Sequence, residues 1–132
     1  MAGEIDNGRF VVQRHQSRSP HFDFRLEHDG VFKSWAVPKG VPEVSGVRRL
    51  TVATPDHELS FGNFEGEIPK GEPGTGVVTI WDHGTYEALR WEDDHFEFTL
   101  SGDRLSGRYH LVRFHRGEER KWLIFKTDKA KQ

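Results

Sequence analysis

The chain is a succession of short runs of alternating polar and apolar residues, separated by turn signals at regular spacing. No segment keeps an apolar period of 3.6 residues for three turns, which excludes an architecture built on long amphipathic helices. Eight or nine short strands at this spacing are typical of an all-β antiparallel sandwich or closed barrel. Short helical turns are expected only within residues 38–49 or 87–94. The predicted strands cover residues 10–13, 21–27, 31–37, 49–54, 77–81, 85–89, 95–100, 107–113 and 121–126.

Length and composition limit the chain to one ordinary domain. Its 132 residues are enough for a single core, to which 10 Phe and 4 Trp contribute bulky side chains. The absence of Cys excludes a disulfide scaffold, thiolate metal sites and a Cys nucleophile. No apolar run approaches the ~18 residues of a membrane span, and the first residues do not resemble a signal peptide. We therefore expect a cytoplasmic, stand-alone protein without a membrane partner, in which residues 9–127 form the domain between flexible tails at 1–8 and 128–132.

The formal net charge of -2 hides an uneven distribution along the chain. Residues 1–50 hold eight Lys or Arg and six Asp or Glu, whereas residues 51–100 hold two and eleven. Residues 101–132 hold nine and four, so two basic segments flank an acidic middle. Folding can join the basic segments into a patch for an anionic partner, although a mixed, solvated surface explains the same numbers.

One stretch carries a pattern that suits metal and phosphate chemistry. On a strand, His21, Asp23 and Arg25 point to the same face at successive spacings of about 7 Å. His15 lies six residues upstream across a loop that ends in Pro20, and this loop can fold His15 back beside His21. Two imidazoles and a carboxylate form a ligand set for a divalent transition metal, and Arg25 can hold a phosphate beside it. The alternative is an ordinary solvated strand face with an Asp–Arg pair.

Other candidate residues have weaker support from the pattern. His57, near the end of a predicted strand, can orient a phosphate oxygen or act as a general acid. Trp91 has charged neighbours and is expected to be exposed, where it can stack on a base. The remaining Trp residues are expected in the core, at Trp35, Trp81 and Trp122. The remaining His residues lack a comparable cluster and are expected to have no role in the site: His28, His83, His95, His110 and His115.

Several motifs in one order resemble the 3′-phosphoesterase domain that accompanies the ligase D class of DNA ligases. The resemblance covers roughly residues 9–127, nearly the whole chain. The matching segments are Phe10-Val11-Val12-Gln13-Arg14-His15, His21-Phe22-Asp23-Phe24-Arg25-Leu26, Ser34-Trp35-Ala36-Val37-Pro38-Lys39-Gly40, Arg49-Leu50-Thr51-Val52, Asp56-His57, residues 61–69, Gly74-Thr75-Gly76 and Trp122-Leu123-Ile124-Phe125-Lys126.

The resemblance implies a compact, closed or partly closed β-barrel and a manganese-dependent hydrolase acting at DNA or RNA 3′ ends. Such enzymes remove a 3′-terminal ribonucleoside and then the 3′-phosphate, leaving a 3′-hydroxyl for repair by non-homologous end joining and ligation. It further implies that Mn²⁺, or another divalent transition metal, is the cofactor. A DNA ligase, a repair polymerase or an end-binding protein is the expected protein partner.

The resemblance also assigns roles to individual residues. His15, His21 and Asp23 are the expected metal ligands, and Arg25 and His57 are expected to engage the phosphate. Basic residues with a function in the family match Lys39 and Arg49, and we count Arg14 with them as a candidate phosphate contact.

Two positions depart from the family pattern. Phe61 stands where a Tyr is common, and Pro55 stands where an acidic residue is frequent. Either difference can weaken the phosphodiesterase or the phosphomonoesterase step. The competing hypotheses are a non-catalytic nucleic-acid-binding barrel that uses an exposed Trp91 and a partner-docking barrel of a repair complex with a degenerate site.

Overall fold

A computed structural model describes residues 7–115 and 118–127 of the chain. In this part of the chain nine strands and one short 3₁₀ helix follow one another. The strands are β1 (Asn7–Gln16), β2 (His21–His28), β3 (Val31–Val37), β4 (Arg48–Glu58), β5 (Gly66–Ile68), β6 (Gly76–Glu92), β7 (His95–Gly102), β8 (Ser106–His115) and β9 (Glu118–Thr127), and the helix η1 spans Leu59–Asn63. The tails predicted at 1–8 and 128–132 lie outside the described residues except for Asn7 and Gly8, which begin β1.

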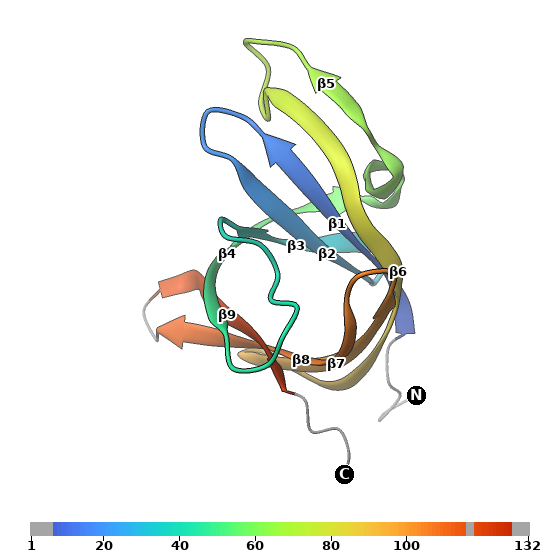
Figure 1. Cartoon of the computed structure of the whole chain (residues 1–132), viewed down its shortest axis with the longest axis vertical. Coiled ribbons are helices and arrows are strands. Elements are labelled where there is room, and N and C mark those ends of the chain that lie inside the picture. Colours follow the sequence, from blue (N-terminus) through green and yellow to red (C-terminus); the bar gives the residue numbers. More distant parts are fainter. Residues whose placement is uncertain (1–6, 116–117, 128–132) are drawn as a thin grey trace.

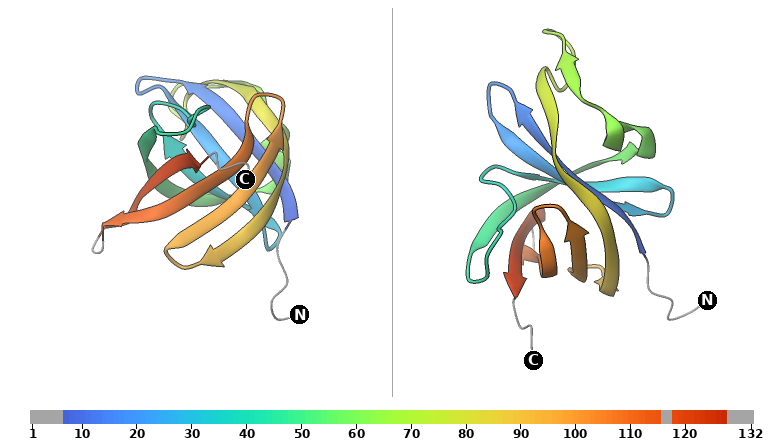
Figure 2. Two further views of the ribbon diagram at one scale, coloured as in Figure 1. Left: turned by 60° about the horizontal axis from the view of Figure 1, so that its bottom comes forward. Right: turned by 45° about the vertical axis from the view of Figure 1, so that its right-hand side comes forward.

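The strands form one antiparallel sheet that closes on itself. The order is β1-β2-β3-β4-β9-β8-β7-β6, and β6 pairs back onto β1, so that eight strands complete a barrel. β5 pairs only with β6, outside this closed circuit. Figures 1 and 2 show β5 and η1 at one end of the barrel, away from β7 and β8. The all-β class and the closed antiparallel barrel predicted from the sequence are confirmed.

β6 is one continuous strand of 17 residues, and not two strands separated by a turn at residues 82–84. Asp82 points inward, where its carboxylate accepts backbone hydrogen bonds from Asp103, Arg104 and Leu105 at 2.9, 3.2 and 2.8 Å. A register shift opposite Val12 and Gln13 lets β6 follow β1 and then β7 without a break. Asp82 therefore holds the β7–β8 turn. The sequence does not indicate this role, because Asp82 and its neighbours His83 and Gly84 are typical of a turn.

The helical turn lies elsewhere than the sequence suggests, which corrects the expectation for residues 38–49 and 87–94. Residues 38–47 form a loop that Arg49 holds through the carbonyls of Lys39 and Gly40, at 2.6 and 2.9 Å. Residues 87–92 stay extended because they pair with β7. Between the strands predicted at 49–54 and 77–81, residues 66–68 form the additional short strand β5.

The barrel interior is an apolar core in which aromatic rings stack on one another. Trp35 and Trp122 are buried there as predicted, and Trp81 packs against the core as a partly buried residue. Trp91 is also partly buried, and its ring stacks on Phe96 and His28 at centroid distances of 4.2 and 4.4 Å. The expectation of an exposed Trp91 is therefore wrong, because its faces are already occupied by other rings.

The two basic segments meet in the sheet. β4 pairs with β9, which places Arg48 opposite Phe125 and Val52 opposite Lys121. No helix within the described residues is long and apolar enough to cross a membrane.

Asp82→Ala tests the inward carboxylate. Three backbone N–H groups lose a charged acceptor, and we expect the free energy of unfolding to fall by about 3 kcal/mol in urea denaturation. The matched control is Asp103→Ala in the same turn, where an exposed side chain is removed and the change should stay within about 0.5 kcal/mol. Equal effects of the two substitutions would contradict this role of Asp82.

Candidate metal and phosphate site

The hairpin of β1 and β2 brings His15, His21 and Asp23 together. His15 pairs directly with His21 across the two strands, and their rings lie 4.8 Å apart. One oxygen of Asp23 lies 3.3 Å from His21 Nε2 and the other lies 3.9 Å from His15 Nδ1. One donor atom from each of the three residues lies within 4.8 Å of the others. This geometry fits a single divalent metal ion bound by two imidazoles and a carboxylate.

Backbone carbonyls orient both imidazoles for this task. His21 Nδ1 lies 2.9 Å from the Ser19 carbonyl, and His15 Nε2 lies 2.9 Å from the Gly74 carbonyl. A carbonyl only accepts, so these nitrogens carry the protons. The lone pairs are then on His21 Nε2 and His15 Nδ1, the two nitrogens that face Asp23. Such outer hydrogen bonds fix the tautomer of metal-binding histidines.

The charges in the site are mutually dependent. Burial acts to raise the pKa of Asp23, but the hydrogen bond to His21 and the charge of Arg25 outweigh it and lower the pKa. When His21 is protonated at Nε2 as well, its hydrogen bond to Asp23 stabilises the charged ring and raises the pKa of His21 despite opposing desolvation. Asp23 is thus an anion at neutral pH that attracts either a proton on His21 or a metal ion.

Arg25 is buried and held on several sides. Its Nε donates to Gln13 Oε1 and its Nη1 donates to Ser34 Oγ, both at 2.7 Å. Nη2 lies 3.6 Å from Asp23, and the guanidinium carbon lies 5.0 Å from the centre of the Phe61 ring. With only 3% of its surface exposed, Arg25 is a fixed positive charge at the wall of the site.

His57 completes the cluster from β4. Its ring stacks on Phe61 at 4.8 Å, and the same Phe61 ring lies 5.0 Å from the guanidinium carbon of Arg25. Burial first, and the charge of Arg25 second, lower the pKa of His57. At neutral pH His57 is therefore mostly uncharged. The ring of Phe61, at the position where a Tyr was expected, provides a carbon surface and no hydroxyl.

A cavity of about 460 Å³ exposes these groups to solvent. Its lining includes all five central candidates, His15, His21, Asp23, Arg25 and His57, and also Pro55. A neighbouring cavity continues from His15 and His21 to Arg18 and Lys70. The site is therefore open to solvent. Besides the Asp23 carboxylate, its walls carry the positive charges of Arg25, Arg18 and Lys70.

The three other predicted phosphate contacts do not line this cavity. Arg14 is exposed and alternates with Gln13 and His15, so it leaves β1 on the opposite side. Lys39 is exposed, and its carbonyl is an acceptor for Arg49, which holds the adjoining loop.

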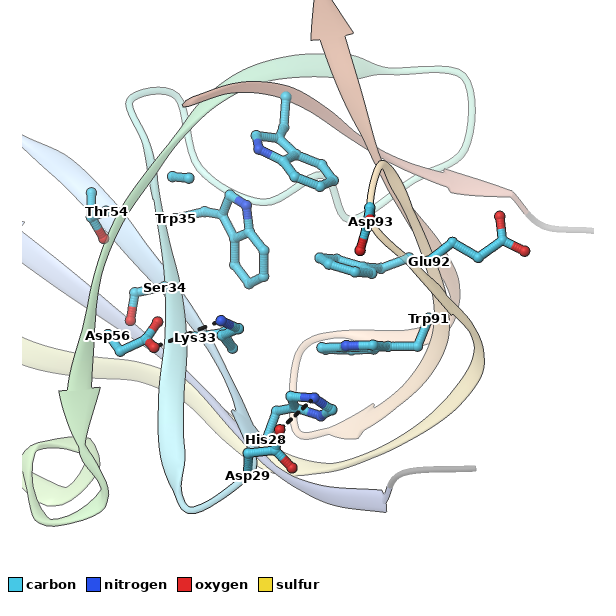
Figure 3. A pocket seen from close by; sticks show the side chains of 13 residues that line it. His28, Asp29, Lys33, Ser34, Trp35, Thr54, Asp56, Trp91, Glu92 and Asp93 are labelled. Atoms are coloured by element: carbon cyan, nitrogen blue, oxygen red, sulfur yellow. Dashed lines mark ion pairs between the residues drawn. The ribbon is translucent and has the colours of Figure 1, made fainter. Parts of the chain in front are cut away.

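A different cavity, of about 390 Å³, lies beside the stacked aromatic rings and is shown in Figure 3. Four carboxylates line it, from Asp29, Asp56, Glu92 and Asp93, and its one Lys side chain, Lys33, pairs with Asp56 at 3.7 Å. This acidic lining disfavours an anionic ligand, in contrast to the cavity that Arg25 lines.

Sequence reasoning missed the residues that position the site. Gln13 holds Arg25 and also donates to the carbonyls of Phe61 and Phe64, at 2.8 and 3.1 Å. Gln13 lies two residues before His15 on the same strand, so strand alternation alone places both side chains on one face. Ser34 and the Gly74 carbonyl come from distant segments, and no local pattern indicates their contacts.

Comparison with known proteins decides the family. Residues 13–113 match the family described as the DNA Ligase D 3′-phosphoesterase domain. The chain belongs to this family. The matched range holds every central site residue.

Similar proteins include longer ones from several bacteria. The chain is 50% identical over 112 residues to the multifunctional non-homologous end joining DNA repair protein LigD of Mycobacterium tuberculosis (strain ATCC 25618 / H37Rv), covering 82% of the chain and 15% of that protein. It is 45% identical over 125 residues to the multifunctional non-homologous end joining protein LigD of Pseudomonas aeruginosa, covering 90% and 15%. The chain thus spans about 15% of the length of these curated relatives.

Substitution of the ligands tests the metal site directly. His21→Ala and Asp23→Ala each remove one donor, and we expect Mn²⁺ affinity at this site to fall by at least about 100-fold, measured from the free-ion signal in electron paramagnetic resonance. Arg14→Ala, on the face of β1 opposite to His15, should bind Mn²⁺ as the unchanged chain does. Circular dichroism verifies folding, and unaltered Mn²⁺ binding by folded His21→Ala would refute the assignment.

Proposed function

We propose that this protein is a metal-dependent phosphoesterase that repairs 3′ ends of DNA. It removes a 3′-terminal ribonucleoside as a phosphodiesterase and then the remaining 3′-phosphate as a phosphomonoesterase. The main support is the arrangement of two carbonyl-oriented imidazoles and an anionic carboxylate next to a buried arginine in one cavity. Membership in the 3′-phosphoesterase family supports the same chemistry.

His15, His21 and Asp23 hold the metal in this proposal, with Mn²⁺ as the preferred ion. A bound divalent cation supplies positive charge that neutralises developing charge on the phosphate oxygens. Arg25 binds a phosphate oxygen through the side of its guanidinium that faces the cavity. Because Gln13 and Ser34 already hold that guanidinium, little reorganisation accompanies substrate binding.

In this proposal His57, which lines the same cavity, also acts on the phosphate. Its lowered pKa makes the neutral imidazole the resting form, which can donate one N–H to a phosphate oxygen. An approaching phosphate dianion raises that pKa again through its negative charge, so His57 can also become the proton donor to the leaving oxygen. Phe61 keeps His57 in place by stacking.

The proposal extends to the setting in which the activity is used. The relatives are described as multifunctional non-homologous end joining proteins, which supports DNA ends as the substrate and end joining as the process. A DNA ligase, a repair polymerase or an end-binding protein is the protein partner we propose. The cytoplasmic location expected from the sequence stays a prediction.

A single assay tests the two-step activity. A 5′-labelled primer–template that ends in one ribonucleotide is incubated with and without Mn²⁺. We expect a 3′-phosphate product that is then converted to a 3′-hydroxyl, and no product in EDTA. A protein that binds the primer equally with and without Mn²⁺ and yields no product would instead be a non-catalytic barrel.

Arg25→Ala measures the phosphate contact in that assay. We expect kcat/KM to fall roughly 30- to 1000-fold, which corresponds to a loss of about 2–4 kcal/mol of transition-state stabilisation. Arg14→Ala serves as the matched control because it removes an exposed arginine eleven positions upstream on the adjoining strand, and its rate should change less than about twofold. A loss below tenfold in Arg25→Ala would identify Arg25 as a structural residue only.

The salt dependence of primer binding separates a local site from an extended one. The cavity and its continuation hold three cationic side chains, Arg25, Arg18 and Lys70, within the described residues. We expect a plot of log affinity against log salt concentration with a shallow slope of about -1 to -3, measured by fluorescence anisotropy. A slope steeper than about -5 would indicate a broad DNA-binding face instead.

A further inference from the structure

A second group of metal-binding side chains lies on the outer face of the barrel. β7 carries His95 and Glu97, and His110 of β8 pairs directly opposite Glu97. The intervening residues Phe96 and Phe98 belong to the core, so the three side chains point away from it. These strands are distant from the β1–β2 hairpin in Figure 1, and the two groups have no residue in common.

We propose that His95, Glu97 and His110 form a second binding site for a divalent transition-metal ion such as Zn²⁺ or Co²⁺. One donor atom from each residue lies within 4.8 Å of the other two. His95 Nε2 and His110 Nδ1 are 3.0 Å apart. Two imidazole nitrogens at bonding distance from one ion are separated by roughly 3.0–3.4 Å, so these nitrogens need almost no movement. Two nitrogens and one carboxylate suit these borderline ions.

The rings are held in this arrangement before any ion binds. His110 stacks on Phe125 at a centroid distance of 5.0 Å with an interplanar angle of 8°. His95, Glu97 and His110 are all partly buried. The cost of ordering the ligands is therefore small.

Two arginines compete with the ion and set its affinity. Arg90 Nη1 lies 2.9 Å from His95 Nδ1, and because a guanidinium only donates, the proton of His95 is then on Nε2. Metal binding at Nε2 moves this proton to Nδ1, and Arg90 turns to Glu92, which it already approaches at 3.8 Å. Arg108 lies 3.4 Å from Glu97 and competes for that carboxylate. Both arginines are exposed, so they can move at little cost.

The bound ion would link β7 and β8 on the outside of the barrel. It would stabilise the folded chain by mass action, since the unfolded chain does not bring the three ligands together. This role is independent of the proposed phosphoesterase activity, because it depends on none of the residues assigned to that activity.

The test is a Co²⁺ titration of the untagged full chain, followed by the absorption bands of tetrahedral Co²⁺ and by calorimetric stoichiometry. We expect two ions for each chain. His110→Gln should retain one ion, and the double variant His21→Ala/Asp23→Ala should retain the other. His83→Gln, which alters an exposed histidine of β6, is the matched control and should retain both. Circular dichroism verifies that each variant is folded.

A further variant tests the tautomer argument. Arg90→Gln replaces a donor with a side chain whose carbonyl can accept from His95 Nδ1–H, and we expect about tenfold tighter binding at the second site. Stoichiometry and spectra unaffected by His110→Gln would overturn the second site. The second site would also be overturned if the chain bound a single ion and the double variant His21→Ala/Asp23→Ala lost it. That result would agree with the proposed phosphoesterase site. One ion that is lost only in His110→Gln would support the second site and count against the proposed function.

Discussion

The pairing of β1 with β6 is the constraint on which the structure depends. It closes eight strands into a barrel and so gives every strand an inner and an outer face. On β2 the inner positions hold Phe24 and Leu26 of the core, and the outer positions hold Asp23 and Arg25. The site residues and the core residues thus alternate along the same strand. Packing of the core therefore fixes the backbone from which the site side chains extend.

Electrostatic balance explains how a charged site is buried at the edge of a small barrel. Desolvation of Arg25 is offset by the two hydrogen bonds that it donates to the uncharged side chains of Gln13 and Ser34, and by the nearby charge of Asp23. Asp23 is in turn surrounded by Arg25 and two imidazoles. A cation bound between the two rings would neutralise the Asp23 carboxylate and use the imidazole lone pairs. The Arg25 guanidinium would remain available to an anion. A phosphate bound to a metal ion would supply both the cation and the anion.

The sequence predicted the part of this site that follows from strand alternation. His21, Asp23 and Arg25 are adjacent on one face, as their period of two requires. The closeness of His15 required a loop of suitable shape, which the pattern allowed but did not dictate. The single strand β6 was missed because Asp82 and Gly84 are turn formers locally, and long-range contacts keep them extended. These contacts are the pairing with β1 and β7 and the hydrogen bonds of Asp82 to the β7–β8 turn. The pairing of His95 with His110 was missed for a related reason, since they are fifteen residues apart on different strands and no short motif connects them.

The orientation of the two metal-site imidazoles by main-chain carbonyls has a consequence for mutational robustness. Ser19 contributes its carbonyl oxygen, so its side chain can be exchanged without removing the acceptor for His21. The Thr75 hydroxyl, in contrast, donates to the carbonyls of Pro69 and Glu72 and so holds the loop that faces His15. Gly74 differs, because its φ of +81° is a conformation that other residues rarely adopt. Variation in the loop opposite His15 is thus restricted at Gly74, and also at Gly71 and Gly76, whose φ values are positive too. Substitution of Gly74 would thus displace a carbonyl that faces His15 without altering any of the three clustered side chains.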